Sequence, residues 1–147
     1  MSAIKIFTWM PDGSQGTLKS IAELEQFYKE RKGKFWLDVL DPDPEFFDFL
    51  LDTMKFHSLT VEDCIFPQNY PRLNEYNDYI FLIIHSLYYY REKKDQPLSN
   101  REVDIFLGQN FLITIHQEHI KGISLNLEML DSSDRTTFKG TEFLLYE

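Results

Sequence analysis

The chain has 147 residues, the length of one domain, and 43% of them are hydrophobic, which is enough to form a sizeable core. Its net charge of -9 argues against nucleic-acid binding, because contact with a phosphate backbone requires clustered Lys and Arg. The longest apolar stretch, Tyr79–Tyr90, is shorter than the roughly 20 residues of a membrane helix, and no signal peptide is evident. The single cysteine, Cys64, fits a reducing compartment.

The first forty residues predict a strand, a helix and a second strand. Ile4–Trp9 is a short apolar run that ends at a turn signature, Pro11–Gly13. Ser20 and Glu23 match a capping box, and apolar residues then recur at helical spacing. Lys34–Leu40 has the β-type residues of another strand. This order predicts a βαβ unit with parallel pairing of its two strands.

The middle of the chain predicts two helices followed by two strands. Asp43 caps the first helix with Pro44 at its first position, and a shorter helix runs from about Ser58 until Pro67. The apolar stripe of the first helix consists of Phe46, Phe47, Leu50, Leu51 and Met54. A short strand over Arg72–Tyr76 precedes a long one, Tyr79–Tyr90. The long strand is apolar on both faces, which predicts a central strand covered by helices on both sides.

The last third predicts a hairpin and further helices. Glu102–Leu107 and Phe111–His116 alternate and flank a Gly-Gln-Asn turn, which is typical of a hairpin. Gln117–Leu130 has helical spacing, and Thr141–Glu147 begins a helix without a stop signal, so we expect the chain to end inside a helix. We therefore predict one α/β domain over residues 1–147. The expected architecture is a three-layer α/β/α sandwich around a mixed parallel and antiparallel sheet of about six to seven strands.

Residues 57–90 contain three short patterns in sequence. The first reads His57-Ser58-Leu59-Thr60-Val61-Glu62-Asp63, the second reads Asn69-Tyr70-Pro71-Arg72, and a strand then opens with Asn77-Asp78-Tyr79. This series resembles the CorA family of magnesium and cobalt transporters, in which a pattern close to His-Pro-Leu-x-x-Glu-Asp is followed by Gln-Arg-Pro-Lys and then by a strand that begins with Tyr. Of the second pattern, only the proline and a basic residue are kept here. The resemblance covers the family's N-terminal cytoplasmic domain and none of its membrane part.

The adjacent carboxylates Glu62 and Asp63 are the candidate metal ligands. Neighbours on a helix point about 100° apart, and a hard cation takes about six or more oxygens, so the pair cannot enclose a cation. From spacing alone, the favoured interpretation is that both carboxylates are solvated surface charges or local caps. The resemblance implies instead a half-site at a subunit boundary of a pentamer. There the pair shares a regulatory Mg²⁺, Co²⁺ or other divalent cation with acidic residues of the neighbouring subunit, and ion occupancy holds the channel closed.

The function implied by this resemblance is that of a regulatory, divalent-cation-sensing domain of a CorA-like transporter, not an enzyme. The full-length protein is then a homo-oligomer in the cell inner (plasma) membrane, with this domain on its cytoplasmic side. Because the stalk ligands lie beyond Glu147, we expect weak magnesium affinity in this chain alone. The zinc-transporting ZntB branch uses a similar domain and is the alternative.

Two other residue patterns could carry chemistry. His116 and His119, with Glu118, could bind a soft metal, but not if His116 ends the hairpin strand. Cys64 follows two carboxylates, which raise the pKa of a thiol and argue against a nucleophile. A free-standing α/β module that binds a small molecule or protein at its strand ends is one different class. A small hydrolase using Glu62 and Asp63 as acid and base is another, although no paired His accompanies them.

Overall fold

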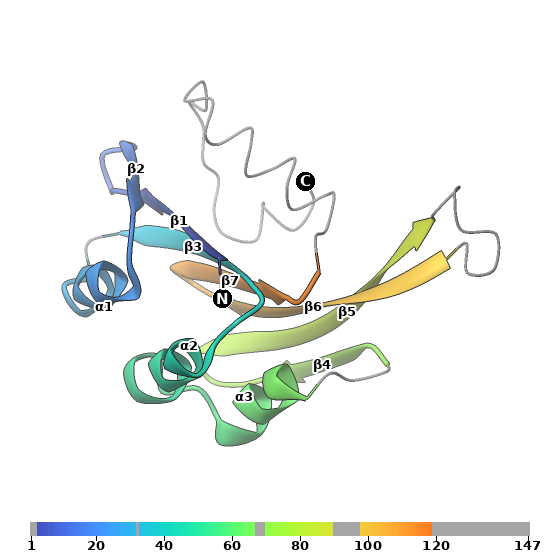
Figure 1. Ribbon diagram of the computed structural model, residues 1–147. Coiled ribbons are helices and arrows are strands. Elements are labelled where there is room, and N and C mark those ends of the chain that lie inside the picture. The colour runs from blue at the N-terminus through green and yellow to red at the C-terminus, as the bar shows by residue number, and fades with distance from the viewer. Residues whose placement is uncertain (1–2, 32, 67–69, 90–97, 119–147) are drawn as a thin grey trace.

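A computed structural model describes residues 3–31, 33–66, 70–89 and 98–118 (Figure 1). Its elements, in chain order, are β1 (Ala3–Trp9), β2 (Gln15–Leu18), α1 (Ile21–Lys29), β3 (Lys34–Leu40), α2 (Pro44–Asp48), the π-helical turn η1 (Phe49–Thr53), α3 (Ser58–Ile65), β4 (Arg72–Glu75), β5 (Tyr79–Tyr89), β6 (Leu98–Gly108) and β7 (Phe111–His116). The structure does not describe residues 119–147. Most of the helix expected over Gln117–Leu130 and all of the one expected at Thr141–Glu147 therefore lie outside the described residues.

The strands form one seven-stranded mixed sheet in the order β2-β1-β3-β7-β6-β5-β4. β3 and β7 pair in parallel, and the other neighbours in this order are antiparallel. The predicted α/β class with a mixed sheet is therefore confirmed. The hairpin predicted around Gly108 is the β6–β7 connection.

The predicted parallel pairing of the first two long strands is wrong. β1 pairs with β3 antiparallel, with Ile6 opposite Leu37. The physical reason is β2, which reverses the chain immediately after β1, so that α1 connects β2 to β3 and leaves β1 between them. Gly33 permits the close approach of β3 to β1, because a Cβ there would lie 2.2 Å from the carbonyl oxygen of Trp9.

The helices of the described part pack on one face of the sheet, as Figure 1 shows. Two of them begin at the predicted caps: the side chain of Ser20 accepts a hydrogen bond from the Glu23 amide at 3.2 Å, and that of Asp43 accepts one from Phe46 at 3.1 Å. The core on this face includes the helical residues Leu24, Phe27, Phe46, Phe49, Leu50, Val61 and Cys64, with Ile6, Phe35, Leu37, Phe81, Ile83, Phe106 and Ile113 from the strands.

The stripe predicted for the second helix needs one correction. Leu51 is 38% exposed, whereas Phe49, outside the predicted stripe, is 2% exposed. The helix continues after α2 as the π-helical turn η1, and a π-turn rotates later residues relative to the spacing of a regular helix.

The long strand β5 also differs from the prediction of a central strand covered by helices on both sides. It is next to the edge strand β4, and Ile84 on the face opposite the helices is 44% exposed.

The opposite face of the sheet has its own buried cluster of strand residues, namely Phe7, Trp9, Trp36, Val103, Ile105 and Leu112. The described residues include no helix on this face, so the second helical layer of the predicted sandwich stays a prediction. Within the described ranges, no helix has the length and apolarity needed to cross a membrane.

Candidate cation-binding site on α3

His57, the first residue of the motif that contains Glu62 and Asp63, is the N-cap of α3 and has a structural role. Its Nδ1 accepts a hydrogen bond from the Leu59 amide at 3.1 Å, so the ring caps the helix. Its own amide donates to the Tyr79 hydroxyl at 2.9 Å, which ties the helix start to β5. The Thr60 hydroxyl donates to the His57 carbonyl at 2.6 Å. The short helix predicted from about Ser58 is therefore present as α3, and His57 caps it.

The two candidate ligands lie on different sides of α3. Thr60, Val61 and Cys64 form its buried face. Glu62 is exposed, and it makes no ion pair within the described ranges. Asp63 is only 17% exposed and pairs with Arg72 of β4, whose guanidinium nitrogen lies 2.5 Å from the carboxylate. The side chains therefore diverge as their adjacency on a helix requires.

The described part of the chain contains no group of three or more His, Cys, Asp or Glu side chains that could hold a metal ion. Glu62 and Asp63 supply at most two ligand groups, and the Arg72 guanidinium already neutralises one of them. A hard cation bound here would need oxygens from water and from another polypeptide segment. The geometry is compatible with a half-site, and nothing in it forms a closed site.

Beneath α3 lies a buried acidic cluster that sequence reasoning missed. Asp104 is 4% exposed, and its Oδ1 has no hydrogen-bond partner among the described residues. Burial, together with the hydrogen bond and negative charge of Glu102, raises the pKa of Asp104 to about 9. Asp104 is therefore a neutral acid at pH 7. The signal was present in the sequence of β6, where Glu102 and Asp104 alternate with apolar residues. Because side chains alternate along a strand, the two acids share one face, and this is the face that packs against α3.

The thiol of Cys64 belongs to the same cluster. Burial first, and then the charge of Asp104, raises the pKa of Cys64 well above its ordinary value. The direction predicted from the neighbouring carboxylates is confirmed, although burial is the larger cause. A buried, protonated thiol is neither a nucleophile nor a zinc ligand.

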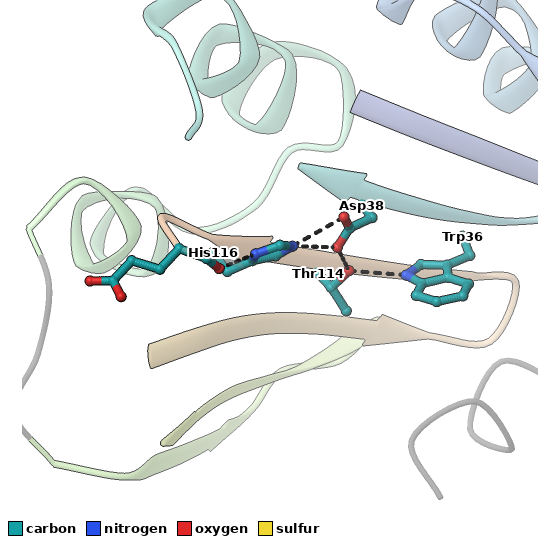
Figure 2. Close-up of polar contacts among 5 residues, drawn as sticks. Trp36, Asp38, Thr114 and His116 are labelled. Atoms are coloured by element: carbon teal, nitrogen blue, oxygen red, sulfur yellow. Dashed lines mark hydrogen bonds and ion pairs between the residues drawn. The ribbon is translucent and has the colours of Figure 1, made fainter. Parts of the chain in front are cut away.

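His116, the first residue of the HQEH motif, forms hydrogen bonds within the protein, as Figure 2 shows. His116 is the last residue of β7, and its Nε2 lies 2.8 Å from Oδ1 of Asp38 on β3. Its Nδ1 lies 2.7 Å from the carbonyl oxygen of Glu118, so this nitrogen must be a donor. Both ring nitrogens are thus engaged within the protein, which confirms that the strand end removes His116 from a helical metal pair. His119 lies outside the described residues.

A chain of hydrogen bonds extends this pair across the parallel pairing of β3 with β7, which we call the parallel joint of the sheet (Figure 2). The Thr114 hydroxyl donates to Asp38 at 2.6 Å and accepts from the Trp36 indole N–H at 3.0 Å. Burial lowers the pKa of His116, but the hydrogen bond and charge of Asp38 reverse this and leave the pKa raised. The network joins β3 to β7 on the face opposite α3, so it supports the sheet and is separate from the candidate ligands.

Comparison with known proteins decides the family. Residues 31–147 match the model of the family described as "CorA-like Mg2+ transporter protein". The chain belongs to this family. Over 112 residues it is 33% identical to the putative metal ion transporter YfjQ of Bacillus subtilis (strain 168), and this covers 76% of the chain and 33% of YfjQ.

Solved structures of CorA-like proteins share the fold. The complete CorA magnesium transporter of Methanocaldococcus jannaschii has a TM-score of 0.74 at 23% identity, over 98% of the chain and 42% of that structure. The ZntB cytoplasmic domain of Vibrio parahaemolyticus has a TM-score of 0.67 at 16% identity, over 96% of the chain and 53% of that domain. The chain thus spans between about a third and a half of the length of these CorA-like relatives.

Proposed function

We propose that this chain is the cation-sensing regulatory domain of a CorA-like magnesium and cobalt transporter, with no enzymatic activity of its own. The supporting observation is α3, which presents Glu62 to solvent beside Asp63 at the position that matches the family's acidic pair. In this proposal the full-length protein is embedded in the cell inner membrane as a homopentamer. The domain lies on the cytoplasmic side, where it responds to intracellular Mg²⁺.

The half-site works through shared ligation between subunits. Glu62 and Asp63 contribute carboxylate oxygens, water completes part of the shell, and a neighbouring subunit supplies the remaining ligands. Because Arg72 neutralises Asp63 within one chain, a cation must compete with the guanidinium for that carboxylate. A single copy therefore binds weakly, and the affinity rises only when subunits adopt the arrangement that brings their carboxylates together. Such coupling makes the cation concentration a signal for the closed assembly.

The donor set favours a hard cation over zinc. Carboxylate oxygens suit Mg²⁺, whereas Zn²⁺ prefers imidazole and thiolate ligands. The thiol of Cys64 is buried and protonated, and the Nδ1 of His57 is engaged as the helix cap. The fold is nevertheless shared with a ZntB domain, so a zinc-transporting member is the second candidate.

The proposal is tested by the double variant Glu62→Gln with Asp63→Asn in a protein extended along its own coding sequence to the length of its relatives. We expect Mg²⁺ to protect the unaltered protein from proteolysis and to stabilise its pentamer in sedimentation, and the double variant to lose both effects. Asp52→Asn, a change of one exposed carboxylate on η1, is the control. Protection that survives in the double variant, or a coding sequence that stops at residue 147, would contradict the proposal and favour a free-standing module.

A further inference from the structure

A cleft of about 360 Å³ opens at the end of the sheet where α1 and η1 end and β5 begins. Its inner wall is aromatic, formed by Phe56, Tyr79 and Phe111, which are 5%, 9% and 7% exposed. Residues of the β6–β7 turn complete the rim. The volume falls in the range of roughly 300–1,000 Å³ that small organic ligands occupy. None of the lining residues belongs to α3, so this cleft is distinct from the candidate cation site.

Two basic side chains, Arg31 and Lys55, line this cleft. Arg31 follows α1, and its guanidinium lies 5.2 Å from the ring centroid of Tyr28. Lys55 follows η1, is exposed, and makes no ion pair within the described part of the chain. The lining also includes one carboxylate, Asp78. The cleft therefore carries a surplus of positive charge on a chain whose net charge is -9.

The backbone at both basic residues is left-handed. Arg31 has φ 54° and Lys55 has φ 60°, and each is the residue after the C-cap of its helix. Glycine adopts this conformation without a steric cost and is the usual residue there. A basic side chain at a helix C-terminus also interacts favourably with the dipole of that helix. Arg31 and Lys55 both line the same cleft.

We propose that the cleft binds a phosphate monoester of a small hydroxylated molecule. A phosphate monoester carries nearly two negative charges at pH 7, which Arg31 and Lys55 can match. A bare phosphate ion would fill little of the volume, and the remaining rim is suited to hydroxyl groups. Its hydrogen-bonding side chains are Asn77, Asp78, Gln109 and Asn110. Sugar phosphates and nucleoside monophosphates share this chemistry.

The ligand class is tested by titrating the 147-residue chain while observing its backbone amides by NMR. Glucose 6-phosphate and AMP are compared with glucose, adenosine and inorganic phosphate. We expect at least one monoester to shift the amides of Gln109 and Asn110 and to bind about tenfold or more tightly than its uncharged counterpart and than phosphate. Binding of AMP alone identifies a nucleotide site, and binding of glucose 6-phosphate alone identifies a sugar phosphate site. Equal binding of all anions, or no binding, overturns the proposal.

Glycine substitutions separate binding from folding. Arg31→Gly and Lys55→Gly remove a charge and supply the residue that the backbone conformation favours, so the melting temperature should not fall. Each should weaken monoester binding about tenfold. Lys29→Gln, two residues before Arg31 and outside the cleft, changes the same charge and should leave the affinity unaltered. If a glycine variant fails to fold, the corresponding glutamine variant replaces it. Native affinity in both basic-site variants would refute the assignment.

Discussion

The buried acid Asp104 gives the sharpest prediction, through the substitution Asp104→Asn. The side chain is 4% exposed, and its pKa is raised from 3.8 to about 9. A carboxyl group with a raised pKa stabilises the fold below its unfolded pKa, and this contribution is lost as the pH rises through the folded pKa. At pH 7 the folded acid must hold a proton that the unfolded chain releases. About three pH units separate pH 7 from the unfolded value, so this proton costs about 4 kcal/mol.

Asparagine has nearly the same shape and never ionises, so the substitution removes this cost. We expect the free energy of unfolding at pH 7 to rise by about 2–4 kcal/mol in urea denaturation. The advantage over the native chain should shrink by about 1.4 kcal/mol for each pH unit between pH 7 and pH 5. Asp52→Asn, at an exposed carboxylate, should change stability by less than about 0.5 kcal/mol. A destabilised Asp104→Asn variant, or an advantage that does not depend on pH, would refute the assignment of a neutral acid.

Three further substitutions test the sheet. Asp38→Asn leaves the buried His116 without its counter-charge and should lower stability by about 3 kcal/mol at pH 6. The loss should become smaller as the pH rises through the raised pKa of His116, where the native imidazolium also gives up its proton. Thr114→Val removes the acceptor of the Trp36 N–H, and calorimetry should show a loss of about 1–3 kcal/mol. Gly33→Ala places a methyl group against the neighbouring strand and should therefore lower the free energy of unfolding. A loss of under about 0.5 kcal/mol would show instead that the backbone there moves aside at little cost.

Local signals in the sequence were sufficient for most of the elements. The caps at Ser20 and Asp43 and the turn at Gly108 depend on neighbouring residues, and each appears in the structure as predicted. The pairing of β1 with β3 was missed because it depends on β2, a four-residue strand within a turn-like stretch. Periodicity cannot identify so short a strand, yet that strand reverses the chain and changes parallel to antiparallel.

The candidate site was predictable in position but not in its surroundings. Adjacent carboxylates at Glu62 and Asp63 predict divergent directions from helix geometry alone, and the structure agrees. The partner of Asp63, Arg72, is nine residues away in another element, so spacing could not reveal it. The pKa of Asp104 likewise depends on burial beneath α3, which only the packed structure determines.

The parallel joint between β3 and β7 has a consequence for the kinetics of folding. On one side of it, β2, β1 and β3 are neighbours in sequence, and on the other side β4 to β7 form a continuous meander. Contacts across the joint, such as that between Asp38 and His116, close a separation of 78 residues. Loop closure of this length is entropically costly, so each half can form before the joint does. Substitutions at the joint should therefore accelerate unfolding and leave the rate of folding almost unchanged.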